Sequence, residues 1–486
     1  MDRVDLNQPR QATRTRLCEE PLDLLVIGGG IVGAGVARDA AMRGLRTGLV
    51  EQHDLAFGTS SRSSRLLHGG IRYLAQGRLG LVHEASREKG ILWRIAPHLA
   101  EPLAFVFPTY RKTPWRLWKL RIGVKMYDFL CGGRNFGPSR AMDRDAIRAY
   151  LPGLNEENLT GAVRYYDGLT NDSRLVLDTL RSAAAHGAII SNYTRLEEAS
   201  PHGDLWRCRV ADALSGRSSE LTARAIVNAT GPWSPSLPQA RIRLRLTKGV
   251  HLVIERERLP VPDAVVMADG RRILFAIPWG QRVILGTTDT DYDGPPEAVQ
   301  TEPADVEYIL KIVNRSFPSA GLKPEDVRAT WAGLRPLIAR RRGKPSDITR
   351  AHKIRMPHPG WIDVAGGKLT TYRLIGQQVV NRAIKRLGCN SPPSRTADEP
   401  LLEPEAVRGQ SGILPPEPSP ELVAHFCRSE WAVHLDDIML RRTSWHYYLD
   451  DRQSVAAQVA QWMSELLGWD SEREEAEIAR YGDGPS

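Results

Sequence analysis

Short apolar runs that end at glycine alternate with segments of helical spacing near the start of the chain. Leu22–Ile27 is an apolar run followed by three glycines, as expected of a buried parallel strand. Small and apolar residues recur at helical spacing over Ile31–Arg43, and Gly44 ends that helix. A second buried strand is predicted over Thr47–Val50, closed by Glu51. Together these segments predict a β-α-β unit, the opening of a doubly wound sheet.

The same patterning predicts further elements of both types downstream. Residues 1–20 are polar and charged, which predicts a disordered tail, and residues 391–420 are rich in Pro, Ser and Glu, which predicts a linker. Beyond the linker the pattern is helical to about residue 480. Helices are expected over 81–96, 114–130, 175–186 and 369–387, and strands over 188–191, 221–228, 246–254, 272–278, 282–287 and 361–365.

Composition adds a preference for anionic partners. The 486 residues include 66 Lys and Arg against 57 Asp and Glu, a net charge of +9. Such a balance favours nucleic acid, acidic lipid or a phosphorylated substrate. The basic residues are scattered and no nucleic-acid module stands out, so nucleic acid is not expected as a partner.

The cysteines and the apolar stretches indicate where in the cell the protein is expected to lie. The five cysteines are far apart and form no C-x-x-C pair, which predicts no metal site and suits reduced thiols in the cytoplasm. The N-terminus lacks the apolar core of a signal peptide. Because no run reaches about 18 charge-free apolar residues, no spanning helix is expected, although the protein could lie on a membrane surface.

A glycine-rich turn joins the first strand to the first helix. It reads Gly28-Gly29-Gly30-Ile31-Val32-Gly33, the pattern G-x-G-x-x-G. Gly28 permits the tight turn, Gly30 lets the backbone approach a pyrophosphate, and Gly33 lets the helix pack on the strand. The helix N-terminus offers N–H groups to phosphate, and Glu51 lies where a carboxylate accepts ribose hydroxyls. The unit therefore predicts dinucleotide binding.

Several blocks between about residues 22 and 375 together resemble the FAD-dependent glycerol-3-phosphate dehydrogenase family, within the D-amino-acid-oxidase-like flavoproteins. The serine-rich block with His-Gly-Gly and the Gly-Gly-Lys-Leu-Thr-Thr block are the most specific. In chain order the blocks are 28–37, 59–64, 68–74, 228–233, 248–249, 277–279, 286–289, 333–337, 348–350 and 366–373.

The resemblance implies FAD as the cofactor and a fold with three parts. A discontinuous Rossmann-like α/β FAD-binding domain would comprise residues 21–100, 160–245 and 345–390. An antiparallel-sheet substrate domain would comprise 101–159 and 246–344, and a C-terminal helical domain 421–486. The cofactor-binding residues implied by the turn and the matched blocks are Gly28, Gly30, Ile31, Gly33, Glu51, Thr59, Ser60, Ser63, Ser64, His68, Gly69, Gly70, Ala229, Thr230, Gly231, Gly333, Gly367, Lys368, Leu369 and Thr370.

The family oxidises sn-glycerol 3-phosphate to dihydroxyacetone phosphate by hydride transfer to flavin N5, and passes electrons to a quinone at the membrane surface. A dianionic substrate requires fixed cations, and Arg gives bidentate contacts. By resemblance His68, Arg335 and Lys368 are catalytic. His68 is the candidate proton acceptor, Arg335 suits oxyanion stabilisation because it stays protonated, and Lys368 could act on the flavin or the phosphate. The residues implied to bind substrate are Arg72, Tyr73, Thr287, Arg335, Arg350 and Lys368.

Other interpretations stay open. An oxygen-using glycerol-3-phosphate oxidase, an amine or hydroxy-acid flavo-oxidase, and a flavin-binding regulatory protein without turnover share the same fold signals. Residues 114–127 mix Trp115 and Trp118 with basic residues at helical spacing, which is typical either of an anionic membrane surface or of a helix packed on the core. The basic run at 340–344 departs from the acidic loop of relatives. A homodimer is one option, but the sequence leaves the oligomeric state open.

Overall fold

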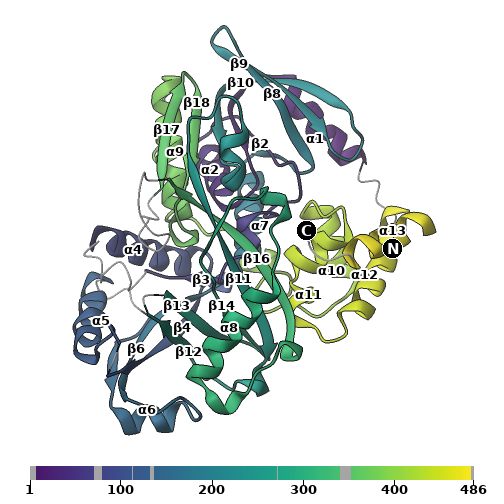
Figure 1. Cartoon of the computed structure of the whole chain (residues 1–486). Helices are drawn as coiled ribbons and strands as arrows, with labels where there is room; N and C mark the ends of the chain where they lie inside the picture. Colours follow the sequence, from purple (N-terminus) through teal and green to yellow (C-terminus); the bar gives the residue numbers. More distant parts are fainter. Residues whose placement is uncertain are drawn as a thin grey trace.

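The computed structural model describes residues 7–69, 79–111, 113–131, 136–270, 272–339 and 352–482. Two sheets lie one above the other in Figure 1, with helices around them and a helical C-terminal domain at one side. This arrangement confirms the predicted α/β class and the helical C-terminal region. None of the helices in the described residues is long and apolar enough to cross a bilayer.

The first sheet carries the predicted β-α-β unit at its centre. β1 (Leu22–Ile27) pairs in parallel with β2 (Thr47–Val50) and with β10 (Ser218–Asn228), and α2 (Ile31–Met42) connects β1 to β2. From Leu24 to Ile27, alternate residues of β1 belong to two different core clusters, so both faces of this part of the strand are buried. This explains why the strand is apolar from Leu24 to Ile27 rather than alternating, with Asp23 the one polar residue, near its start. The other strands of this sheet are β7 (Ile189–Ser191), β8 (Thr194–His202), β9 (Leu205–Asp212), β17 (Lys353–His358) and β18 (Trp361–Ala365).

The second sheet has ten strands and is mostly antiparallel. Its strand order is β15-β11-β14-β13-β12-β4-β6-β3, with β16 beside β11 and β5 beside β6. The strands are β3 (Leu66–Leu67), β4 (Glu101–Tyr110), β5 (Arg140–Met142), β6 (Leu159–Leu169), β11 (Leu244–Glu255), β12 (Ala264–Asp269), β13 (Arg272–Trp279), β14 (Arg282–Gly286), β15 (Thr290–Tyr292) and β16 (Val327–Ile338).

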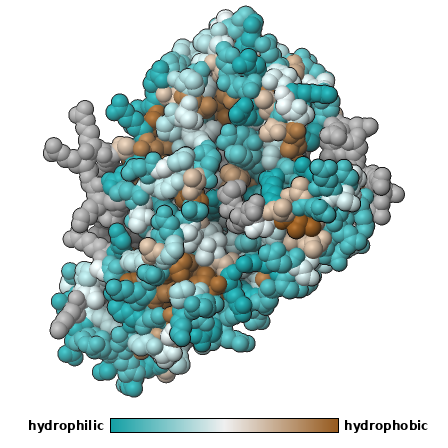
Figure 2. All heavy atoms as spheres, turned by 45° about the vertical axis from the view of Figure 1, so that its right-hand side comes forward, coloured by the Kyte–Doolittle hydropathy of each residue, from teal (hydrophilic) through white to brown (hydrophobic). Residues whose placement is uncertain are grey.

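Helices cover both sheets and form the C-terminal domain. α7 (Asp172–Ala185) and α9 (Tyr372–Leu387) pack beside α2 at the first sheet. The second sheet carries α5 (Leu117–Cys131), α6 (Arg144–Tyr150) and α8 (Pro303–Ser316). α4 (Leu79–Ile95) lies between the sheets' cores, with Val82 in the core of the second sheet and Ile91, Leu92 and Ile95 in that of the first. The C-terminal domain consists of α10 (Pro420–Ser429), the π-helix η11 (Asp437–Arg442), α11 (Trp445–Tyr448), α12 (Arg452–Leu467) and α13 (Ser471–Gly482). Hydrophilic residues cover most of the face shown in Figure 2, and its apolar areas are small and separate.

The predicted disordered tail over residues 1–20 is wrong for most of its length. Asn7–Glu19 forms helix α1. Arg10 and Arg14 both form ion pairs with Asp212, and Leu17 is buried. These three residues, at helical spacing, attach α1 to the rest of the protein. The average polarity of residues 1–20 does not reveal them.

Two predicted boundaries also differ from the structure. Residue 160 was assigned to the start of an FAD-binding segment, but it lies in β6, which pairs with β4 in the second sheet. The predicted linker 391–420 has little regular structure, yet it is packed rather than loose. Arg38 donates hydrogen bonds to three backbone carbonyls of this segment, and Leu401 is buried.

Candidate active site

The glycine turn between β1 and α2 is built on contacts that exclude side chains. Gly28 has φ of 110°, in the region that favours glycine. A Cβ on Gly28 would lie 2.7 Å from the carbonyl oxygen of Ala229, and a Cβ on Gly33 would collide with the carbonyl oxygen of Gly28. The backbone N–H of Ile31 at the start of α2 donates to Ser60 Oγ at 3.0 Å. The turn therefore leaves a bare backbone at a helix N-terminus, the arrangement that accepts a pyrophosphate.

Glu51 lies at the end of β2 and faces this turn. Its Oε2 accepts from the backbone N–H of Gly29 at 2.7 Å, and its Oε1 accepts from that of His53 at 2.9 Å. Burial raises the pKa of Glu51, although these two N–H donors act in the opposite direction. A carboxylate has about four acceptor positions, so Glu51 can still accept ribose hydroxyls.

A two-part cleft runs from this turn toward the second sheet. The outer part is lined by Gly28, Gly30, Ile31, Glu51, Thr59, Ser60, Ser63, Ala229, Thr230, Gly231, Gly367, Lys368 and Leu369, among others. The inner part is lined by Thr59, Ser63, Ser64, His68, Gly333, Arg335, Gly367, Lys368, Leu369 and Thr370, together with Arg62, Gly249 and His251. The shared residues make the two parts one continuous cleft.

The remaining predicted residues lie elsewhere. Gly33 supports the turn from behind, and the backbone N–H of Gly69 donates to Asp167 rather than lining the cleft. Thr287 does not line either part of the cleft as the described residues form it, but its Oγ1 accepts from Arg335 Nη2, which does. Gly70, Arg72, Tyr73 and Arg350, and the basic run 340–344, fall outside the described residues.

The serine-rich block makes its hydrogen bonds within the protein. Thr59 Oγ1 donates to the carbonyl of Leu334 at 2.6 Å, and Ser64 Oγ lies 2.8 Å from His251 Nε2. Thr370 links two sequence blocks, because its Oγ1 accepts from the backbone N–H of His68 at 3.1 Å and donates to the carbonyl of His68 at 3.3 Å. The block is therefore an ordered wall of the cleft rather than a flexible serine linker.

Arg335 on β16 is a cation of the inner cleft whose guanidinium has several hydrogen-bond partners. Its Nη2 donates to Thr287 Oγ1 at 2.9 Å, and its Nη1 donates to the carbonyl of Thr288 at 3.1 Å. Nη1 also lies 3.4 Å from a carboxylate oxygen of Asp289. The guanidinium lies over Gly249, where a Cβ would leave no room for it. Three partners thus fix a permanent positive charge in the cleft.

His251 is an inner-cleft residue that sequence reasoning missed. It is buried, and its ring stacks on Trp331 with centroids 5.2 Å apart. Burial lowers the pKa of His251 to about 3, and the charges of Arg335 and Arg65 act in the same direction. His251 is therefore neutral at physiological pH. The only sequence signal was a histidine within a predicted strand, next to the matched Lys248-Gly249 block.

FAD fits this cleft on three observations. A Cβ on Gly28 or Gly33 would collide with backbone atoms, so the turn presents backbone without side chains at the N-terminus of α2, where a phosphate can bind. Glu51 has acceptor capacity at the end of β2. The cleft continues past Gly367, whose φ is 95°, to the cations Lys368 and Arg335, and fixed positive charge suits the pyrimidine end of a flavin and an anionic substrate.

Comparisons with known proteins agree with this geometry. Residues 23–380 match the family described as FAD dependent oxidoreductase, and residues 419–474 match the C-terminal domain of alpha-glycerophosphate oxidase. Glycerol-3-phosphate dehydrogenase of Mycobacterium leprae is 34% identical over 98% of this chain and 90% of its own length. Aerobic glycerol-3-phosphate dehydrogenase of Staphylococcus aureus is 38% identical over 78% of this chain and 70% of its own length.

Solved structures give the same result for the fold. The FAD complex of glycerol-3-phosphate dehydrogenase from Bacillus halodurans has a TM-score of 0.78 and 28% identity, covering 98% of this chain and 97% of that one. L-alpha-glycerophosphate oxidase from Mycoplasma pneumoniae has a TM-score of 0.60 at 17% identity, covering 77% of this chain and 97% of that one, and is similar in fold. The chain belongs to the FAD-dependent glycerol-3-phosphate dehydrogenase family, within the D-amino-acid-oxidase-like flavoproteins, and its cofactor is FAD.

Proposed function

We propose that this protein oxidises sn-glycerol 3-phosphate to dihydroxyacetone phosphate and passes the electrons to a quinone. When bound, FAD supplies the acceptor for the hydride that leaves the secondary alcohol carbon. The observation that carries the proposal is the fixed charge of Arg335 beside His68, His251 and Lys368 in the inner cleft. Family membership supports the same substrate.

Arg335 and Lys368 are the cations proposed to hold the substrate. A guanidinium gives directional contacts to phosphate or to the reacting oxygen and stays protonated. Thr287 orients Arg335 by accepting one of its N–H groups. Lys368 lines both parts of the cleft, so its charge can act on the cofactor, on the substrate, or on both. Arg72, Tyr73 and Arg350 remain predicted substrate ligands on the strength of the family resemblance.

The proton of the hydroxyl needs an acceptor. A group with a pKa of about 3, as His251 has, binds a proton weakly at neutral pH, and a general base works best with a pKa near the working pH. We therefore keep His68 as the proposed base. His251 is proposed to accept a hydrogen bond as a neutral imidazole that is oriented by Ser64 and Trp331.

The decisive experiment adds sn-glycerol 3-phosphate to the FAD-loaded protein without oxygen. We expect the flavin absorbance near 450 nm to bleach, whereas glycerol and sn-glycerol 1-phosphate leave it unchanged. Absence of bleaching by sn-glycerol 3-phosphate would refute the substrate assignment.

The match of residues 419–474 to an oxidase domain favours one alternative, in which oxygen is the acceptor. Reoxidation of the bleached enzyme by oxygen and by a soluble quinone distinguishes the two. The quinone proposal predicts that quinone reoxidises the flavin faster than air-saturating oxygen, and the reverse order would overturn it.

One face of α5 supports contact with a membrane surface, where a lipid quinone resides. Trp118, Ile122, Met126 and Phe129 are exposed at helical spacing, and Phe129 is 82% exposed. Basic residues at 116, 119, 121 and 125 lie on the same segment. An amphipathic helix with this composition inserts its apolar face among lipid headgroups.

Of the two tryptophans in this segment, only Trp118 is part of the proposed face. Trp115 packs against Phe107 with ring centroids 5.3 Å apart, and its Nε1 donates to the carbonyl of Gly270. We expect Phe129→Glu to abolish flotation with anionic liposomes, and Leu214→Glu, at an exposed leucine on the β9–β10 turn, to leave it intact. Equal flotation of both variants would remove the membrane proposal.

A further inference from the structure

Asp54 is a buried carboxylate in the cofactor-binding loop that is bound by two consecutive arginines of the C-terminal domain. It lies three residues beyond Glu51 and is 1% exposed. Arg442 Nη2 donates to Asp54 Oδ1 at 2.8 Å. Arg441 Nε and Arg442 Nη1 both donate to the other oxygen, Oδ2. Two residues far away in the sequence therefore provide three of the four hydrogen bonds that the described residues make to the Asp54 side chain, and the fourth comes from Asn192 Nδ2 at 3.4 Å.

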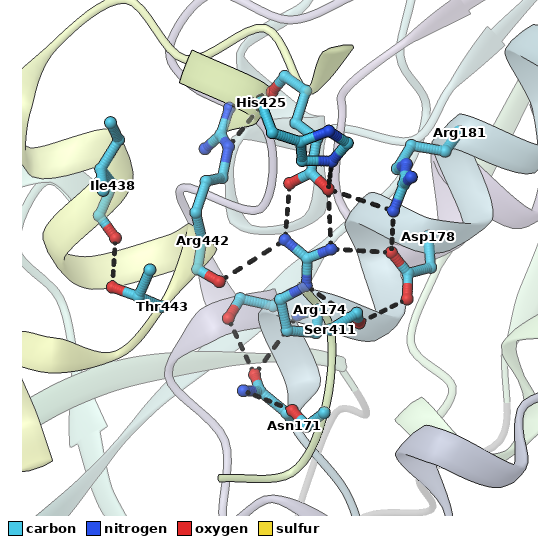
Figure 3. A network of polar contacts seen from close by, with 12 residues as sticks. Asn171, Arg174, Asp178, Arg181, Ser411, His425, Ile438, Arg442 and Thr443 are labelled. Carbon is cyan, nitrogen blue, oxygen red and sulfur yellow. Dashed lines mark hydrogen bonds and ion pairs between the residues drawn. The ribbon is translucent and has the colours of Figure 1, made fainter. Parts of the chain in front are cut away.

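The π-helix η11 explains how adjacent arginines can reach one carboxylate. Successive side chains of an α-helix diverge by about 100°, whereas a π-helix widens the turn and is often found at functional positions. Arg441 also pairs with Asp437 at 2.7 Å within the same helix. Thr443 Oγ1 donates to the carbonyl of Ile438 at 2.7 Å and closes the last turn (Figure 3). The geometry of η11 thus directs both guanidinium groups toward Asp54.

A second ion-pair cluster lies next to the contact between Arg442 and Asp54. Arg174 at the start of α7 makes two bonds to Glu430 of the C-terminal domain, at 2.5 and 2.9 Å, and one to Asp178 at 2.9 Å. Figure 3 shows Arg174 between Asp178 and the segment that carries Arg442. Arg442 Nη2 donates at 2.7 Å to the backbone carbonyl of Glu430. Arg442 therefore joins the cluster on α7 to the carboxylate of Asp54.

The loop that Asp54 anchors carries groups that line the outer cleft. The backbone carbonyl of Asp54 accepts a hydrogen bond from the N–H of Phe57 at 3.2 Å. Phe57 stacks on His53 with ring centroids 4.2 Å apart, and the N–H of His53 is a partner of Glu51. His53, Phe57 and Glu51 all line the outer cleft. Asp54 is thus linked through Phe57 and His53 to Glu51, the carboxylate beside the glycine turn.

We infer that Asp54 is a positioning residue for FAD. The C-terminal domain strengthens cofactor binding because its Arg441 and Arg442 hold the Asp54 side chain in place. The domain itself supplies no residue to the outer cleft among the described parts of the chain. Its effect on the cofactor is therefore exerted through the loop. This inference depends on FAD binding in the cleft and is independent of the substrate and of the electron acceptor.

Asp54→Asn tests the inference in the full-length protein. Asparagine keeps the shape of aspartate but removes the carboxylate that pairs with the buried Arg442, while Arg441 keeps its ion pairs with Asp436 and Asp437. Hydrogen bonds to charged groups are worth enough that losing one changes an equilibrium roughly tenfold or more. We expect the FAD dissociation constant, followed by the fluorescence of released FAD, to rise at least about tenfold, with kcat at saturating FAD little changed.

Glu477→Gln is the matched control, because Glu477 is a buried carboxylate of the same domain that pairs with His434 and Arg473 and does not contact the loop. It should lower the thermal midpoint without weakening FAD binding beyond about twofold. Arg442→Lys, which keeps the charge but loses the second hydrogen bond, should give an intermediate dissociation constant. If Asp54→Asn leaves FAD affinity unchanged, or if all three variants weaken it in proportion to their loss of thermal stability, the inference is refuted.

Discussion

Replacing Arg335 by methionine tests the proposed substrate contact most directly. The Arg335 side chain is 19% exposed and is aimed by Thr287, Thr288 and Asp289. Methionine keeps much of the length and the apolar stem but removes the charge. One charge-assisted hydrogen bond to the reacting oxygen is worth about 1.5–3 kcal/mol, which is roughly 10- to 150-fold in kcat/KM. We expect a loss in this range without loss of FAD.

The assay is the rate of anaerobic flavin bleaching by sn-glycerol 3-phosphate in a stopped-flow instrument, with FAD content measured on the same sample. Arg328→Met is the matched control, because Arg328 lies on the same strand, is 56% exposed and pairs with Glu255 away from the cleft. Its bleaching rate should equal that of the unmodified protein. If Arg335→Met bleaches within about threefold of the unmodified rate at every substrate concentration, Arg335 does not stabilise the transition state.

Three further predictions follow from individual contacts. Gly33→Ala places a Cβ against the carbonyl oxygen of Gly28, so the purified protein should lack absorbance near 450 nm; normal flavin content would contradict the tight turn. The pKa of His251 is lowered to about 3 in the folded protein, so between about pH 3 and 6.5 the unfolded chain binds more protons than the folded one. Protonation of His251 therefore lowers the free energy of unfolding as pH falls, by up to about 1.4 kcal/mol per pH unit. His251→Gln should show a smaller drop in thermal midpoint from pH 7 to pH 5 than the unmodified protein, and an equal drop would refute the lowered pKa. Arg14→Met removes one ion pair to Asp212 and should lower the unfolding free energy by roughly 1–3 kcal/mol, measured in urea, whereas no change would mean that α1 is not docked in solution.

The sequence predicted the β1-α2-β2 unit almost to the residue because every signal there is local. The strand is buried on both faces from Leu24 to Ile27 and is therefore an apolar run there, and Gly28 follows its end. Glu51 follows β2 directly, so its place beside the turn is set by the pairing of two neighbouring strands. Local patterns and the family resemblance therefore lead to the same predicted nucleotide site.

The second sheet was predicted only in part. β11, β13 and β14 were expected, but the long strands β4 and β6, which pair with each other along ten residues of β4, were not. β4 is broken in sequence by Pro102 and Pro108, which count against a strand. The partner strand lies some fifty residues away, so no short window contains the pairing that stabilises it.

The predictions for residues 1–20 and 391–420 were wrong for a related reason. Both are polar on average, and average polarity predicts a chain without a core of its own. Arg14 and Arg38 instead form their bonds with carboxylate and carbonyl groups more than 190 residues away in sequence. Buried arginines of this kind look like surface residues until the fold supplies their acceptors.

The inner cleft depends on the register between β11 and β16, which no sequence window contains. In that ladder His251 lies opposite Trp331, and Gly249 lies opposite Gly333. The first pairing produces the stack that orients His251. The second leaves two facing positions without side chains, and the Arg335 guanidinium occupies the space over Gly249 while the backbone of Arg62 occupies the space at Gly333. The facing glycines Gly249 and Gly333 therefore leave the space that lets the Arg335 guanidinium lie in the inner cleft, next to the residues that line the cofactor site.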